Sequence, residues 1–294
     1  MSLSPGVHSV LVTPFAEDES FDEPSCRTLL DFYAGAGVAG VLVLGVLGEA
    51  HRLSDAERAA VQSACLAVAG GRVQVTVGVT HPSTVVARGR ALDAERAGAA
   101  AVMVSPTPGT AAGPGLSDHF RRIADGLSIP IVIQDLPSVS GVKIPVEWLA
   151  ALAEDLPPGS VVKLEDPPTP AKTAKLRAAA PSLAVLGGLG GVALLQELDA
   201  GSAGTMTGFA FPELLVEIVD AHRSGDTARA RRVYEQALPL LVFEAQEGIG
   251  LGVRKEILRR RGAIECAKVR SPAPSLDPLT LSALDALLAV EERA

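Results

Sequence analysis

The sequence predicts a (β/α)₈ TIM barrel with a C-terminal helical extension. Eight short apolar runs alternate with longer amphipathic segments between residues 8 and 208, which is the order expected of parallel strands joined by helices. The length of 294 residues suits one such barrel, and a composition of 48% hydrophobic but only 3% aromatic residues suits an aliphatic core. A doubly wound sheet is the alternative, but it usually has fewer strands and a glycine-rich first turn, which "VTPFAEDES" is not.

The predicted strands share a high content of Val, Leu and Ile, and they occupy residues 8–15, 41–45, 73–79, 101–105, 129–135, 160–165, 183–188 and 203–208. Helical spacing fills the segments between them. In residues 54–70, Ser54 and Glu57 have the spacing of a capping box and Gly70 is a stop signal. Residues 83–98 and 117–128 show the same kind of spacing.

After the eighth strand the pattern is purely helical. Helices are expected at residues 212–225, 226–248, 252–262 and 277–293. The first of these closes the barrel, and the others form the extension. We therefore divide the chain into a barrel, residues 1–222, and a helical extension, residues 223–294.

Charge and composition argue against several classes of function. The net charge of −8, with no Lys/Arg run interleaved with aromatic residues, argues against nucleic-acid binding. Three scattered cysteines imply neither a disulfide framework nor a paired-cysteine zinc site. No signal peptide and no apolar run of membrane-spanning length is evident. We expect a cytoplasmic enzyme that does not contact membranes.

The carboxyl ends of barrel strands are where catalysis is expected. Lys163 and Glu165 end the sixth strand two residues apart, so both side chains point to the same face. An apolar lumen favours the neutral amine of a lysine over the ammonium, and a neutral amine forms a Schiff base with a ketone or aldehyde. A neighbouring carboxylate can then move protons on the imine. The alternative is a structural ion pair at the strand mouth.

Other candidate sites carry weaker signals. Gly188, Gly190 and Ala193 have the spacing of a dinucleotide fingerprint, but they follow the seventh strand and not the first. This loop is better suited to an anionic or polyhydroxy part of a substrate, or to tight-turn packing. Glu49 and His51 lack a third metal ligand. We therefore expect neither a metal nor a cofactor. Thr207, in the eighth predicted strand, is expected to line the site.

Several motifs together resemble the dihydrodipicolinate synthase/N-acetylneuraminate lyase family of class I aldolase-type barrels. They are "VTPFAEDESFDEP", "GVAGVLVLGVLGEAHRLSDAER", "IPIVIQDLP", "VVKLED" and "AGSAGTMTGFAFPE", and they cover nearly the whole chain. The resemblance implies that Lys163 condenses with the 2-oxo group of a pyruvate-like substrate. It also implies a homodimer or homotetramer.

The sequence departs from the family pattern at positions that bear on the substrate. Val46 and Leu47 replace the two hydroxyl residues that hold the substrate carboxylate and relay a proton, so backbone N–H groups around residues 46–48, including Gly48, would have to take over. Gln134 replaces the proton-transferring tyrosine, and an amide is neither an acid nor a base near pH 7. We assign the proton transfer to Glu165 and substrate orientation to Gln134.

Gln134 together with Lys163-x-Glu165 is similar to a branch of the family that dehydrates 2-keto-3-deoxy sugar acids. The leading hypothesis is therefore a cofactor-free, Schiff-base-forming lyase that dehydrates such an acid. A retro-aldolase that releases pyruvate is the first alternative, and a dihydrodipicolinate synthase-like condensation is less favoured. A non-catalytic barrel that binds a 2-oxo acid is the alternative from a different class.

Overall fold

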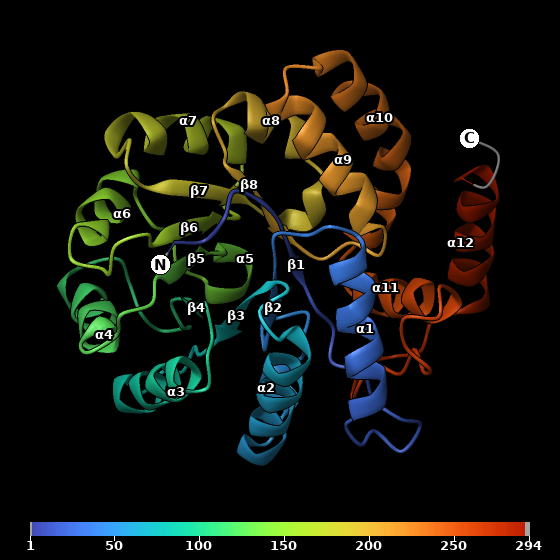
Figure 1. The fold of residues 1–294 in the computed structure, drawn as a ribbon, viewed down its shortest axis with the longest axis horizontal. Coiled ribbons are helices and arrows are strands. Elements are labelled where there is room, and N and C mark those ends of the chain that lie inside the picture. The colour runs from blue at the N-terminus through green and yellow to red at the C-terminus, as the bar shows by residue number, and fades with distance from the viewer. Residues whose placement is uncertain (1, 292–294) are drawn as a thin grey trace.

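The computed structural model describes residues 2–291 and confirms the predicted barrel. Parallel strands β1 to β8 pair in chain order, and β8 pairs with β1 to close the sheet. Helices surround the strands, as Figure 1 shows. The strands are β1 (Gly6–Val10), β2 (Gly40–Val43), β3 (Gln74–Gly78), β4 (Ala101–Val104), β5 (Ile131–Asp135), β6 (Val161–Leu164), β7 (Ala184–Gly187) and β8 (Gly204–Thr207).

Seven of the predicted strands differ from the observed ones by one or two residues at an end, but the first was predicted too long. It ends at Val10 and not at residue 15. Pro14 has no N–H to donate to a neighbouring strand, and Phe15 instead forms an antiparallel bridge with Phe21. The carboxyl end of β1 therefore turns away from the sheet.

Alternate residues of the strands fill the barrel lumen. Together with Leu3 they form an apolar cluster that is separate from the helix-facing residues. Its members are Leu3, Val10, Leu42, Ala101, Met103, Val132, Val161, Leu186 and Met206. Side chains at the intervening positions, such as Val162 and Leu164, belong to the larger cluster between strands and helices. The two-residue period of a strand places Gln134 above Val132 and Lys163 above Val161, at the open end of the lumen.

The helices of the barrel follow the expected order. They are α1 (Glu23–Gly35), α2 (Asp55–Ala69), α3 (Thr84–Arg96), α4 (Pro114–Ala124), α5 (Pro137–Ser140), α6 (Val146–Ala153), α7 (Thr169–Ala179) and α8 (Leu194–Asp199), with short 3₁₀ turns η1 (Ala50–Arg52) and η2 (Leu189–Gly191). The capping box of Ser54 and Glu57 is confirmed, and Gly70 ends α2 in a left-handed conformation. Helix α4 lies earlier than predicted because Pro114 occupies its first turn.

The C-terminal helices are α9 (Pro212–Arg223), α10 (Thr227–Glu244), α11 (Gly250–Arg260) and α12 (Pro278–Glu291). Helix α9 packs on α10 and on β1, and α11 and α12 lie at one side of the barrel in Figure 1. Positions 292 and 293 of the predicted last helix lie outside the described residues. The division between residues 222 and 223 stays a prediction.

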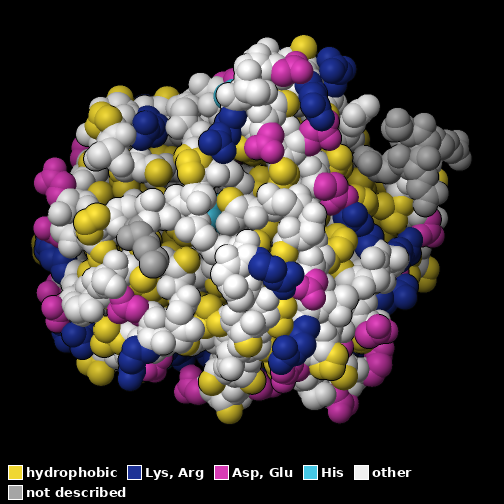
Figure 2. Space-filling model, in the orientation of Figure 1, with side chains coloured by type: hydrophobic (Ala, Val, Ile, Leu, Met, Phe, Trp, Pro, Cys, Tyr) yellow, Lys and Arg dark blue, Asp and Glu magenta, His cyan; other side chains and the backbone are white. Residues whose placement is uncertain are grey.

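Surface features agree with the charge pattern of the sequence. On the face shown in Figure 2, basic and acidic side chains are interspersed, and the basic ones form no continuous patch among the described residues. Within residues 2–291, none of the helices has both the length and the apolar character needed to cross a bilayer.

Candidate active site

A cavity of about 440 Å³ opens at the carboxyl ends of the strands. Its wall combines residues from the barrel with residues from the turn between α10 and α11. Six of the eight predicted site residues line it: Val46, Leu47, Gln134, Lys163, Glu165 and Thr207. The structure thus brings together side chains that are up to 161 positions apart in the sequence, from Val46 to Thr207.

The carboxylate of Glu165 is the centre of the polar contacts in this cavity. Its Oε2 atom lies 3.3 Å from Lys163 Nζ and accepts a hydrogen bond of 2.7 Å from Gln134 Nε2. The side chains of Lys163 and Glu165 are only 5% and 8% exposed. The amine and the carboxylate are therefore held together at the lumen mouth, with a neutral amide that orients the carboxylate.

Gly188 and Gly48 shape the site without lining the cavity. A side chain at Gly188 would overlap Glu165, and the neighbouring Leu189 N–H donates to Glu165 Oε1 at 3.4 Å. Gly48 accepts a hydrogen bond of 2.6 Å from Thr13 Oγ1 through its carbonyl oxygen. The positions of the two glycines explain how Glu165 and the β2 loop are placed, while their predicted contact with substrate stays a prediction.

The loop after β2 presents apolar side chains to the cavity. Val46 is 40% exposed and Leu47 is half-buried. Among the described residues, the N–H groups of Leu47 and Gly48 donate to no acceptor. The loop therefore offers backbone donors but no side-chain hydroxyl near the mouth.

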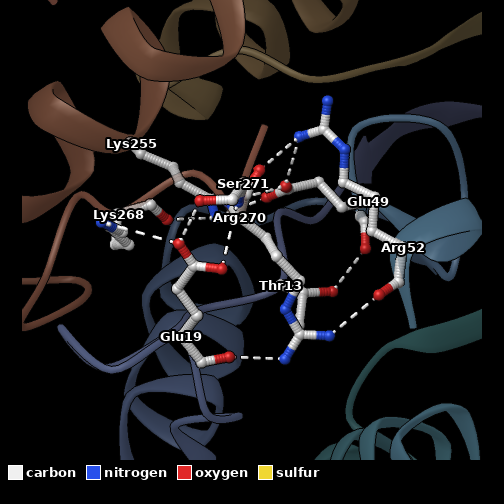
Figure 3. A network of polar contacts seen from close by, with 9 residues as sticks. Thr13, Glu19, Glu49, Arg52, Lys255, Lys268, Arg270 and Ser271 are labelled. Carbon is white, nitrogen blue, oxygen red and sulfur yellow. Dashed lines mark hydrogen bonds and ion pairs between the residues drawn. The ribbon is translucent and has the colours of Figure 1, made fainter. Parts of the chain in front are cut away.

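Glu49 anchors this loop through a network that Figure 3 shows. Its Oε1 atom accepts from Lys255 Nζ at 2.7 Å, and both side chains are fully buried. Its Oε2 atom accepts from Arg52 Nη1 and from the Arg270 N–H, each at 3.0 Å. Lys255 also donates to the Lys268 carbonyl at 2.7 Å. Glu49 is thus a hydrogen-bond acceptor that ties the β2 loop to α11 and to the segment after it.

Two residues that line the cavity were missed by the sequence reasoning. Arg254 on α11 and Glu244 at the end of α10 form a buried ion pair, with 2.8 Å between Nε and Oε2. Glu244 also accepts from the Ala210 N–H at 3.2 Å, and desolvation by burial raises the pKa of its carboxyl. The ten-residue separation across a helix boundary gives no local signal for such a pair.

A third missed residue, Glu197 on α8, lies near Glu165 but does not line the cavity. It is fully buried, contacts Gly187, and accepts a hydrogen bond from Thr169 Oγ1 at 2.5 Å. Its Oε2 atom has no hydrogen-bond partner among the described residues. Desolvation, with a contribution from the nearby Glu165 charge, raises the pKa of Glu197 to about 7.

Neither tyrosine is placed to transfer protons in the cavity. Tyr33 donates to the Phe209 carbonyl at 3.2 Å, and Tyr234 donates to the Val192 carbonyl. Neither is part of the cavity wall. Within the described part of the chain, no three His, Cys, Asp or Glu side chains are grouped closely enough to hold a metal ion.

Comparison with known proteins gives matches along the whole chain. The profile of the Dihydrodipicolinate synthetase family matches residues 3–290. The L-2-keto-3-deoxyarabonate dehydratase of Azospirillum brasilense is 33% identical over 297 residues, which cover 96% of this chain and 93% of that protein. The 4-hydroxy-tetrahydrodipicolinate synthase of Brucella abortus is 31% identical over 289 residues, covering 95% and 96%.

A solved structure agrees with these sequence matches. The crystal structure of dihydrodipicolinate synthase from Rhodopseudomonas palustris superposes with a TM-score of 0.92 at 34% identity, covering 98% of this chain and 99% of that one. Together with the family profile, it confirms the resemblance inferred from the sequence motifs.

Replacing Lys255 with Met is expected to lower the free energy of unfolding by about 3–5 kcal/mol, because the buried Glu49 carboxylate would lose its only fully buried cation and Oε1 would lose its hydrogen-bond donor among the described residues. Urea denaturation measures this loss, and hydrogen exchange should show faster opening of residues 44–52. The double variant E49Q/K255M should recover part of the stability. The matched control K268M removes a longer, partly exposed pair of 3.7 Å with Glu19 and should change stability by less than about 0.5 kcal/mol. Equal losses in K255M and K268M would contradict this account.

Glu197 makes the stability of the protein depend on pH. Its pKa rises from 4.5 when unfolded to about 7 when folded, so the folded state holds a proton that the unfolded state releases. This stabilising difference is full below pH 4.5 and is lost as the pH rises towards 7. Relative to E197Q, the parent should therefore lose up to about 3 kcal/mol between pH 4.5 and pH 8. Urea denaturation of both proteins at several pH values measures the difference; parallel pH profiles would exclude the effect.

Proposed function

Because the chain belongs to the dihydrodipicolinate synthetase family and is a lyase, as members of that family with their Schiff-base lysine are, we propose that it dehydrates a 2-keto-3-deoxy sugar acid through an imine on Lys163. The observation that carries the proposal is the contact of 3.3 Å between Lys163 and Glu165 in a cavity where Gln134 fixes the carboxylate. The relative from Azospirillum brasilense, whose name describes such a dehydratase, supports the choice of substrate class.

The reaction begins at the amine of Lys163. The Nζ atom adds to the C2 carbonyl of the substrate, and the carbinolamine loses water to give an iminium ion. Glu165 lies beside Nζ and accepts and returns the protons that this exchange requires. The buried position of both side chains limits competing water at the iminium carbon.

The iminium ion acidifies the hydrogens on C3. Glu165 removes one of them, and the electron pair of the C–H bond forms an enamine. The enamine then expels the C4 hydroxyl, which leaves as water with the proton that Glu165 returns. A C3=C4 double bond conjugated to the iminium remains. Water adds to C2, Lys163 leaves as the free amine, and the dehydrated 2-oxo acid is released.

Condensation of the synthase type is a second candidate, favoured by the similarity to synthases from Brucella abortus and Rhodopseudomonas palustris. The described cavity wall argues against it, because it holds no tyrosine and its loop after β2 presents Val46 and Leu47 in place of hydroxyls. A retro-aldolase needs the same imine but a base at the C4 hydroxyl. Product analysis separates the three reactions. Dehydration gives a single dehydrated acid, retro-aldol cleavage gives pyruvate plus an aldehyde, and the synthase reaction gives a condensation product.

Borohydride reduction in the presence of pyruvate or a 2-keto-3-deoxy sugar acid should add a substrate-derived mass to the peptide that holds Lys163. K163A should give no adduct and should lose turnover, while the matched control K175A, which alters an exposed lysine on α7, should behave like the parent. Peptide mass spectrometry locates the adduct. Normal turnover by K163A would rule out imine chemistry at this residue.

E165Q should separate imine formation from elimination. The amide keeps the size of the side chain but cannot take the C3 proton, so dehydration should fall by roughly 10²–10⁴-fold. Trapping of pyruvate on Lys163 should fall much less. A steady-state dehydration assay beside the trapping assay measures both, with E147Q, at an exposed position on α6, as the matched control. Parental dehydration by E165Q would show that another group transfers the proton.

A further inference from the structure

Arg254 is a buried cation in the cavity wall to which the proposed chemistry gives no task. Its side chain is 3% exposed and lines the same cavity as Lys163. The Nε atom donates to Glu244 Oε2 at 2.8 Å. Neither Nη atom donates a hydrogen bond to any of the described residues. One edge of the guanidinium group is thus engaged, and the other is available to a ligand.

The guanidinium group of Arg254 lies beside the loop after β2, which carries Leu47 where the family pattern has a hydroxyl residue. A Cβ at Gly208, directly after β8, would be 2.6 Å from Leu47 Cδ1 and 3.3 Å from Arg254 Cζ. Both groups therefore flank the same glycine, and the absence of a side chain there lets them approach. The cation occupies the neighbourhood of Leu47, where the family resemblance places a hydroxyl that contacts the substrate carboxylate.

The electrostatics of the pair permit a second anion. A guanidinium group has five N–H donors in a planar fork and binds carboxylates along two different edges. Burial raises the pKa of the Glu244 carboxyl, which favours its neutral form over the carboxylate. The repulsion between Glu244 and an incoming substrate carboxylate is thereby reduced.

We propose that Arg254 binds the C1 carboxylate of the 2-oxo acid through its free Nη edge, in place of the missing hydroxyl pair. The inference rests on the proposed imine chemistry, because it assigns the partner of the carboxylate next to the carbonyl that Lys163 attacks. The carboxylate would lie between Arg254 and the β2 loop, whose Leu47 and Gly48 N–H groups have no acceptor among the described residues. C2 then faces Lys163 across the cavity.

A purely structural role for Arg254, as the partner that neutralises Glu244, is the competing explanation. It predicts that the loss of Arg254 affects charged and neutral ketones alike, because only the shape of the cavity would change. A carboxylate partner predicts selective loss for the charged ketone. Pyruvate and pyruvamide differ in this charge but hardly in size, so the two form a suitable pair of probes.

The experiment compares the concentrations of pyruvate and pyruvamide that give half-maximal borohydride trapping on Lys163. R254Q should raise this concentration at least tenfold for pyruvate and less than twofold for pyruvamide. The double variant E244Q/R254Q, which buries no unpaired charge, should show the same selectivity and guards against a folding defect. R254K should recover part of the pyruvate binding. The matched control R261Q alters an arginine outside the cavity and should behave like the parent.

Equal loss for both ketones, or no loss for either, in the folded double variant would overturn the assignment of Arg254. Failure of the proposed function gives a different result, since the parent itself would then form no adduct. In that event, calorimetric titration of pyruvate into K163A and K163A/R254Q tests Arg254 without an imine. Binding that is at least tenfold weaker in K163A/R254Q supports the carboxylate site, and equal binding refutes it.

Discussion

The candidate site depends on the register between β5 and β6. In this parallel pair, Gln134 is the direct partner of Lys163, and Val132 is the partner of Val161. Partners in a parallel sheet point to the same face, so the two polar side chains lie in one layer above the apolar lumen. A slip by one residue would turn Lys163 outward and place Val162 in the lumen. The chemistry that we propose for the amine of Lys163 therefore depends on this strand pairing.

A second set of charges holds this register at the strand ends. Lys172 on α7 donates to Asp135 at 2.6 Å and to Asp166 at 3.0 Å, and it also donates to the Ile144 carbonyl at 2.7 Å. Asp135 ends β5 and Asp166 follows β6, so one cation bridges the two strands directly outside the lumen. The same contact explains why acidic residues occur at these ends without facing the cavity.

The C-terminal helix α11 contributes side chains to the candidate site and to the loop that lines it. Arg254 and Lys255 are consecutive on α11 but make different contacts, because neighbouring side chains on a helix point about 100° apart. Arg254 reaches the cavity, whereas Lys255 reaches Glu49 beneath the β2 loop. The barrel mouth and the loop that lines it are therefore positioned by a segment that lies more than two hundred residues later in the chain.

Local patterns in the sequence predict those structural features that depend on residues close together in the chain. The eight strands follow from the alternation of apolar runs, the start of α2 from its capping box, and the shared face of Lys163 and Glu165 from a two-residue spacing. Contacts made only by closure of the barrel leave no such pattern. Arg254, Glu244, Glu197 and Lys172 occur on amphipathic helices whose sequences are those of ordinary surface helices. Only the fold shows the polar partners that these side chains reach. Arg254 meets Glu244, Glu197 meets Thr169, and Lys172 meets Asp135.

The distribution of carboxylates bears on the stereochemistry of the proposed elimination. Glu244 accepts hydrogen bonds from Arg254 and the Ala210 N–H, Glu197 is buried and does not line the cavity, and Glu247 lines the cavity but is exposed. The amide of Gln134 carries no transferable proton near pH 7. In the proposed mechanism, Glu165 is the carboxylate of the described cavity residues that would take the proton from C3 and return it to the departing C4 hydroxyl. A single carboxylate reaches both groups only when they lie on the same side of the substrate, so the geometry favours a syn elimination.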